Sequence, residues 1–201
     1  MILKLINTSI PDVLLLEPNV YDDPRGFFLE IFHQTKYTDV GIDKTFVQDN
    51  YSHSKHGILR GLHYQLLHPQ GKLIFVLSGE IFDVAVDIRR GSSTFGQWFG
   101  VNLSAENKRQ IYVPEGFAHG FCVLSESADV MYKCSDFYDA EDEYGIFWSD
   151  ETIAIDWPVK TPILSEKDSK FQILDEIPEK NLPIYGGTDE TRTRNSSNLS
   201  P

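Results

Sequence analysis

The stretch KLIFVLSGEIFDVAVDIRRGSSTFGQWFGVNLSA, residues 72–105, decides the fold class. It contains three short runs of β-branched and aromatic residues, separated by turn signals at Ser78-Gly79 and at Arg90-Gly91-Ser92. Residues 109–138 contain three more such runs, interrupted at Pro114-Glu115-Gly116 and Glu126-Ser127. Many short strands at nearly even spacing predict an all-β sandwich or barrel.

Helical periodicity is rare in this chain. We expect short peripheral helices at residues 33–41 and 165–174, and a third at residues 104–108. The length of 201 residues fits one domain, which we place at residues 1–185. The rest, 186–201, is polar and lacks aromatic residues, so we expect a disordered tail there.

Composition narrows the cellular setting and the partners. Two cysteines are too few for a disulfide framework, and the N-terminus lacks the features of a signal peptide, so we expect a cytoplasmic protein. No apolar run reaches the roughly 20 residues of a spanning helix, so no membrane span is expected. A net charge of −12 disfavours nucleic acid as a partner.

The charge is unevenly distributed. No Asp or Glu occurs from residue 50 to residue 79, whereas three cations and four histidines do: Lys55, Arg60, Lys72, His53, His56, His63 and His68. Chance clustering on a surface is the ordinary explanation. However, the basic residues alternate with apolar strand formers, so this cationic window, residues 50–79, also predicts an anion site in a cleft.

Strand alternation places polar groups among apolar ones. In residues 80–90 one face carries Phe82, Val84, Val86 and Ile88, and the other carries Asp83, Ala85 and Asp87. We expect one of these faces to be core. In residues 116–124, His119 shares a side with Phe117, Phe121 and Val123. A barrel with a lined cavity accommodates such inward polar groups.

Two segments resemble the paired motifs of the cupin superfamily: GILRGLHYQ, residues 57–65, and VPEGFAHGF, residues 113–121. At positions that hold metal ligands in metal-binding cupins, this chain has His63, Gln65 and Lys72. An ammonium donates no lone pair and an amide is a poor ligand, so we expect no metal. The same cationic groups suit an oxyanion.

The chain as a whole resembles the dTDP-4-dehydrorhamnose 3,5-epimerase family. The resemblance runs in order through DPRGFFLEIF (23–32), QDNYSHSKHGILRGLHYQ (48–65), QGKLIFVLSGEIFDVAVDIRRGSSTFG (70–96), LSAENKRQIYVPEGFAHGFCVLS (103–125), MYKCSDFYD (131–139) and ILSEKD (163–168). It implies a cupin-type jelly roll that forms a homodimer and needs no cofactor. The implied reaction converts dTDP-4-dehydro-6-deoxy-D-glucose to dTDP-4-dehydro-6-deoxy-L-mannose, the precursor of dTDP-L-rhamnose, by epimerisation at C3 and C5.

The resemblance also implies roles for four catalytic residues. His63 matches the base, Asp168 the carboxylate that orients it, Lys72 the partner of the enolate oxygen, and Tyr132 the acid on the opposite face. An imidazole titrates near pH 6.5, which suits proton removal at neutral pH. For each of these four residues, an ordinary structural role is the alternative to the catalytic one. In particular, the Ser165-x-x-Asp168 pattern also suits the first turn of a helix.

The remaining matched positions concern the nucleotide and the sugar. Arg60 and, from the neighbouring subunit, Arg25 match the diphosphate contacts. Phe28 and Glu30 match thymidine contacts and are also expected to reach the neighbouring subunit's site. Further matched positions are Gln48, Asn50, Tyr138, His119, Asp83 and Glu143, and the separate roles of the last three stay open.

Three alternatives to the double epimerase stay open. A related enzyme could invert only C3 or only C5 of a dTDP-4-keto-deoxysugar. A non-catalytic cupin could bind a nucleotide sugar as a sensor or scaffold. A metal-dependent cupin dioxygenase would require a stoichiometric metal, against the lysine at position 72.

Overall fold

The computed structural model describes residues 3–186. The strands are β1 (Lys4–Ile6), β2 (Leu14–Glu17), β3 (Val20–Asp23), β4 (Gly26–Leu29), β5 (Gln48–Lys55), β6 (Leu59–Gln65), β7 (Lys72–Ser78), β8 (Glu80–Asp87), β9 (Trp98–Ser104), β10 (Gln110–Val113), β11 (Phe117–Val123), β12 (Ser127–Cys134) and β13 (Glu143–Gly145). The helices are α1 (Gln34–Asp39) and three 3₁₀ turns, η1 (Asp168–Lys170), η2 (Leu174–Glu176) and η3 (Glu179–Asn181). The predicted disordered tail falls, beyond Gly186, outside the described residues.

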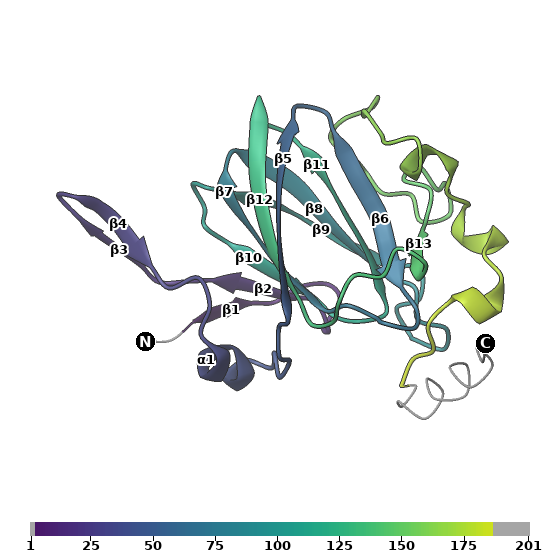
Figure 1. The fold of residues 1–201 in the computed structure, drawn as a ribbon, viewed down its shortest axis with the longest axis horizontal. Coiled ribbons are helices and arrows are strands. Elements are labelled where there is room, and N and C mark those ends of the chain that lie inside the picture. Colours follow the sequence, from purple (N-terminus) through teal and green to yellow (C-terminus); the bar gives the residue numbers. More distant parts are fainter. Residues whose placement is uncertain (1–2, 187–201) are drawn as a thin grey trace, which may run out of the picture.

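Two antiparallel sheets form the body of the molecule (Figure 1). One sheet has six strands in the order β1-β2-β10-β7-β12-β5, and the other has five in the order β13-β6-β11-β8-β9. Strands adjacent in sequence repeatedly fall in different sheets, as in a jelly roll. The predicted all-β jelly roll is confirmed, and the predicted strand runs in residues 72–105 and 109–138 form β7 to β12.

The main core lies between the two sheets. The six-stranded sheet supplies aliphatic side chains such as Ile74 and Val130, and the five-stranded sheet supplies Phe117 and Phe121 opposite them. Successive side chains of a strand point to opposite faces, so these residues share the inward face, while neighbours such as Leu73 and Cys122 pack in clusters on the outer faces. This packing fixes the separation of the sheets and leaves room at one side for a cavity.

The outer face of the five-stranded sheet is also buried. The C-terminal segment, shown yellow-green in Figure 1, covers it, and Trp157 and Leu174 pack on Val84 and Val86 of β8. The predicted alternation in β8 is confirmed, but Asp83, at 0 % exposure on the other face, is buried as well. The expectation of a single core face was therefore wrong, because a covering segment lies outside the sheet.

Only one of the three predicted helices forms as an α-helix. The helix predicted at residues 33–41 is α1, whose Tyr37 packs on the outer face of the six-stranded sheet. Residues 104–108 form a turn, because Ser104 and Asn107 each accept a hydrogen bond from the other's backbone N–H. Within residues 3–186, no helix is long and apolar enough to cross a membrane.

The helix predicted at residues 165–174 is replaced by η1 and the start of η2. Between them, Phe171 is extended, and the Gln172 carbonyl accepts the Phe147 N–H at 2.8 Å. Tertiary hydrogen bonding to the chain after β13 thus competes with the local helical preference.

The hairpin β3-β4 projects away from both sheets (Figure 1). Its aromatic residues Phe27 and Phe28 are 58 % and 69 % exposed. A two-stranded hairpin with exposed rings gains little stability by itself, and contiguous exposed apolar surface commonly marks an interaction site.

A buried carboxylate fixes the loop between β8 and β9. Asp87, at 0 % exposure, accepts hydrogen bonds from the Arg89 guanidinium and from the Ser92 and Thr94 hydroxyls. We expect Asp87→Asn to lower the free energy of unfolding by about 3 kcal/mol, because it removes the buried anion of the part-buried Arg89 guanidinium and leaves only the exposed Asp12 as a charged partner. Urea unfolding measures this effect. Asp12→Asn, which removes an exposed partner of the same guanidinium, should cost less than about 1 kcal/mol.

The effect of Asp87→Asn should depend on pH. Burial by itself raises the pKa of Asp87, but the hydrogen bonds from Arg89, Ser92 and Thr94 lower it overall. A carboxyl whose pKa is lower in the folded state stabilises the protein above the unfolded pKa of about 3.9 and loses that contribution as the pH falls further. The gap between wild type and variant should therefore shrink below about pH 4. A constant gap down to pH 2 would contradict this assignment.

Candidate active site

A cavity of about 660 Å³ lies between the two sheets on the side of β5 and β6. Both sheets line it: Gln48, Asn50, Lys72 and Tyr132 come from the six-stranded sheet, and Arg60, His63, His119 and Glu143 from the five-stranded sheet. The segment 163–168 and Tyr138 complete the wall. The volume is that of a typical small-molecule site.

A β-bulge in β6 aims two of these side chains into the cavity. In the pairing of β6 with β11, His63 lies opposite His119 and Arg60 lies opposite Phe121, so β6 has one extra residue between these two pairs. In a regular strand Arg60 and His63 would face opposite sides. Gly61 occupies the bulge, where a Cβ would lie 2.6 Å from the Gly120 Cα.

His63 lies between two carboxylates. Its Nε2 is 2.9 Å from Asp168 Oδ1, and its Nδ1 is 3.8 Å from Glu143 Oε1. When Nε2 carries the proton donated to Asp168, Nδ1 keeps the lone pair needed by a base. The Phe171 ring contacts the imidazole edge-on, with centroids 5.7 Å apart.

Asp168 is both a turn residue and a partner of the histidine. Its backbone N–H donates to Ser165 Oγ at 3.0 Å, as the Ser-x-x-Asp pattern predicts, while its carboxylate reaches His63. Burial by itself raises the pKa of Asp168, but hydrogen bonds from His63 and the Gly61 N–H lower it overall. The carboxylate therefore stays ionised beside the imidazole.

Lys72 and Tyr132 enter the cavity from adjacent strands of the six-stranded sheet. They lie on β7 and β12, which pair through Cys134 with Lys72 and Tyr132 with Ile74. Burial lowers the pKa of Lys72, against the influence of nearby acidic groups. Burial raises the pKa of Tyr132, and the Arg60 guanidinium partly offsets that rise. Tyr132 is thus held as a protonated phenol.

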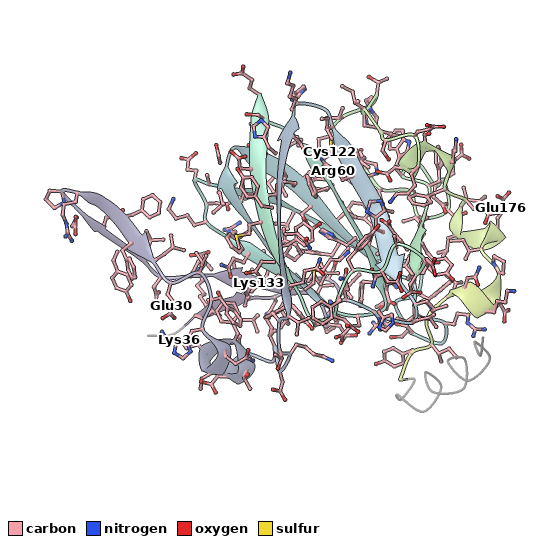
Figure 2. The ribbon with its side chains drawn as sticks, viewed as in Figure 1. Glu30, Lys36, Arg60, Cys122, Lys133 and Glu176 are labelled. Atoms are coloured by element: carbon pink, nitrogen blue, oxygen red, sulfur yellow. The ribbon has the colours of Figure 1, made fainter. Side chains whose placement is uncertain are left out.

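The mouth of the cavity carries Arg60. This residue is exposed, and its Nε donates to Ser54 Oγ at 3.0 Å. Figure 2 labels Arg60 on β6, far from Glu30, which follows the hairpin, and from Lys36 of α1. Among residues 3–186, Ser54 is the only hydrogen-bond partner of this guanidinium, so its other N–H groups can meet an anionic ligand at the entrance.

A second histidine–carboxylate pair lies deeper in the cavity. His119 is 7 % exposed, and its Nε2 is 3.0 Å from Asp83 Oδ2. His119 lines the cavity, whereas Asp83 sits behind it. Asp83, which the sequence matches to a pocket position, is thus not part of the cavity lining and meets it only through the His119 imidazole.

A network joins the cavity wall to its rim. Glu143 Oε2 accepts hydrogen bonds from the Tyr138 hydroxyl at 2.6 Å and from Lys167 Nζ at 2.5 Å. The carboxylate raises the pKa of Tyr138 to about 12. Gln48 Oε1 accepts the Tyr138 backbone N–H at 2.9 Å, and Gln48 Nε2 donates to Asn50. Glu143, Gln48 and Asn50 are thus connected through Tyr138, and their role in binding stays a prediction.

The sequence model of the dTDP-4-dehydrorhamnose 3,5-epimerase family matches residues 7–176. The chain belongs to this family. A dTDP-4-dehydrorhamnose 3,5-epimerase from Shigella flexneri is 59 % identical over 172 residues, which are 85 % of this chain and 95 % of the relative. A dTDP-4-dehydrorhamnose 3-epimerase from Streptomyces niveus is 37 % identical over 186 residues, 91 % of this chain and 90 % of the relative.

Among solved structures, an epimerase of this family from Legionella pneumophila is 53 % identical and superposes with a TM-score of 0.90. The match covers 92 % of this chain and 100 % of that one. That protein, a dTDP-6-deoxy-D-glucose-3,5-epimerase, was crystallised in complex with dTDP-4-keto-L-rhamnose. The two chains thus share a fold over nearly their whole length.

Three predicted ligand contacts of the epimerase lie outside the cavity. Arg25 and Phe28 are on the projecting hairpin, and Glu30 follows it and accepts from Lys36 at 2.6 Å. The Arg25 guanidinium pairs with Asp23 of its own hairpin. Within one chain these residues do not join the site, which is consistent with their expected reach to a neighbouring subunit.

The cationic window is only partly a cavity feature. Arg60, His63 and Lys72 line the cavity, whereas His53 and His56 are exposed outside it. The wall is also not purely cationic, because Asp168 and Glu143 come from other parts of the chain. Sequence reasoning passed over Lys167, although it stands beside Asp168 in the ILSEKD motif.

Proposed function

We propose that this protein epimerises dTDP-4-dehydro-6-deoxy-D-glucose at C3 and C5 and forms dTDP-4-dehydro-6-deoxy-L-mannose, the precursor of dTDP-L-rhamnose. One observation carries the assignment: His63 with its carboxylate, Lys72 and Tyr132 converge on one cavity from both sheets. A base, a cation and a phenol in one site suit proton exchange next to a ketone.

His63 is the proposed base. It removes the hydrogen from the carbon beside the C4 ketone, and Asp168 holds the ring and stabilises the imidazolium that forms. Glu143, on the Nδ1 side, adds to this stabilisation. His63 acts at C3 and at C5 in turn, because both carbons flank the same ketone.

Lys72 and Tyr132 complete the proposed reaction. Removal of the proton leaves negative charge on the C4 oxygen, and the Lys72 ammonium stabilises it. Tyr132 then donates its phenolic proton from the opposite side, which inverts the carbon. Arg60 assists because its positive charge favours the phenolate. After each inversion, solvent returns a proton to the Tyr132 phenolate and takes one from the His63 imidazolium, so both groups are reset for the second carbon.

The nucleotide part of the substrate is proposed to lie toward the mouth of the cavity. Arg60 contacts the diphosphate, and the exposed Tyr138 ring offers an aromatic face to the base. A homodimer would bring the partner's hairpin, with Arg25, Phe28 and Glu30, to this mouth, and would cover the rings that one chain leaves exposed.

We also propose a cytoplasmic location, since both cysteines are free and buried.

Exchange of substrate hydrogens with solvent tests the proposal. The protein is incubated with dTDP-4-dehydro-6-deoxyglucose in heavy water, and C3 and C5 are followed by NMR. We expect deuterium at both carbons. Deuterium at one carbon only would identify a single-site epimerase, and tight binding without exchange would identify a non-catalytic binder. Either outcome would overturn the double epimerase.

The shared site makes a separate prediction. Arg25→Ala should weaken dTDP binding by about 10-fold or more, because a charge-assisted contact to the diphosphate is lost. Calorimetric titration measures this affinity. Arg90→Ala is the matched control, since Arg90 pairs with Glu179 on the C-terminal segment. Unchanged affinity of Arg25→Ala would contradict the shared site.

A mixing experiment sharpens this test. Arg25→Ala and Arg60→Ala homodimers each carry damage in both sites. When the two variants reassort, a mixed dimer carries one intact site and one doubly damaged site, so about a quarter of the wild-type activity should return. No recovery after reassortment would mean that Arg25 and Arg60 serve the same chain's site or none.

A further inference from the structure

Gln65 uses its whole amide to hold backbone groups. Its Nε2 donates to the carbonyls of His68 at 2.6 Å and Phe137 at 3.1 Å, and its Oε1 accepts the Asp139 N–H at 3.0 Å. Both amide hydrogens are thereby engaged. Gln65 is 5 % exposed on the cavity wall, so it is poorly placed to donate to a ligand.

These bonds join two loops that end at functional residues. Residues 66–71 lead into Lys72 at the start of β7. Residues 135–142, here the crossing loop, pass from β12 in one sheet to Glu143 at the start of β13 in the other. The crossing loop also holds the first loop, because buried Asp142 accepts hydrogen bonds from the backbone N–H groups of Leu66, Leu67 and His68.

The crossing loop carries the rim aromatics. Phe137 and Tyr138 are 64 % and 51 % exposed, so packing alone does not hold them. Tyr138 is positioned by polar contacts instead: its N–H donates to Gln48, its hydroxyl to Glu143, and Gln65 binds the peptide groups on both sides of it. The orientation of this ring therefore depends on the Gln65 amide.

We infer that Gln65 is a positioning residue that sets nucleotide affinity through Tyr138. The inference rests on the proposed function for the location of the nucleotide. Gln65 holds the tip of the crossing loop, whereas its base is fixed independently: Gly71 N–H donates to Ser135 Oγ and Ser135 N–H to the Gly71 carbonyl. Loss of the amide should thus make the tip of the crossing loop more mobile, while Lys72, next to the Gly71–Ser135 pair, keeps its position.

Two variants test the inference. Gln65→Glu keeps the shape but replaces two N–H donors by an oxygen that faces two carbonyls, and Gln65→Met removes all three hydrogen bonds with an apolar side chain of similar length. For both we expect dTDP to bind about 10-fold more weakly, with KM raised and kcat within about 3-fold of wild type. Amide hydrogen exchange should accelerate at Tyr138 and Asp139.

Asp150→Asn is the matched control. Asp150 is also buried and also holds backbone N–H groups, those of Thr152, Ile153 and Leu174, but it lies outside the cavity wall. It should lower thermal stability without changing dTDP affinity. The inference is overturned if the Gln65 variants lose stability while dTDP affinity and exchange at Tyr138 stay at wild-type values.

The two proposals fail in different ways. Absence of deuterium at C3 and C5 in the wild-type protein would end the epimerase assignment and leave the dTDP-binding comparison intact. Normal turnover with unchanged dTDP affinity in both Gln65 variants would end the positioning role and leave the epimerase assignment intact.

Discussion

Replacing His63 by alanine should lower kcat by about 10⁴-fold, the upper end of what a positioned base contributes. The variant loses the ring that Asp168 holds at 2.9 Å, and no deuterium should enter C3 or C5 at a measurable rate. The affinity for dTDP should change little, because His63 is proposed to contact the sugar that is epimerised and not the nucleotide. Kinetics in heavy water and a dTDP titration measure the two effects separately.

His56→Ala is the control for the His63 variant. His56 is exposed and bonds to the Leu124 carbonyl, away from the cavity wall. Its removal should leave kcat near the wild-type value. If His63→Ala kept more than about a tenth of wild-type exchange at either carbon, another base would act there and the proposed mechanism would be wrong at that carbon.

Replacing Lys72 by methionine should lower kcat by about 10³-fold, because the C4 oxygen loses the cation that stabilises its developing charge. Methionine keeps most of the aliphatic stem, so the cavity should keep its shape. The loss should appear in kcat and in kcat/KM alike, the signature of an interaction made mainly in the transition state. Steady-state kinetics measure both.

Lys133→Met is the matched control for Lys72. Lys133, labelled in Figure 2, lies on the adjacent strand β12. It pairs with Asp49, and its ammonium lies 5.2 Å from the centre of the Phe32 ring. The prediction requires that this variant lose some stability at most, with kcat preserved. Equal losses of kcat in the two variants would point to a general effect of surface charge and would count against Lys72 as the enolate partner.

The sequence predicts the alternation of side chains along a strand, but it does not predict which faces of that strand become buried. The alternation in residues 80–90 is local information, because successive side chains of a strand point to opposite faces. The strand β8 follows it, with Ala85 in the core between the sheets and Val84 and Val86 in the cluster outside. The burial of both its faces is not local. It depends on Trp157 and Leu174, which are distant in sequence and cover the outer side.

The sequence predicted which residues belong to the site, but it did not predict how their side chains are arranged. Arg60 and His63 are three positions apart and would point to opposite sides of a regular strand. They share the cavity because the pairing of β6 with β11 inserts one residue at Gly61. Similarly, Gln65 was predicted only as the residue that replaces a metal ligand, whereas its bonds to His68, Phe137 and Asp139 depend on loops that meet in space.

The sequence by itself determined the strand order along the chain, the family, and the residue types available for proton transfer, because these follow from local alternation and ordered motifs. Only the tertiary structure decided which groups meet. Asp168 reaches His63 across 105 positions, and a predicted helix gives way at Phe171 to contacts with the chain beyond β13. Such pairings depend on the packing of distant segments, which no local pattern encodes.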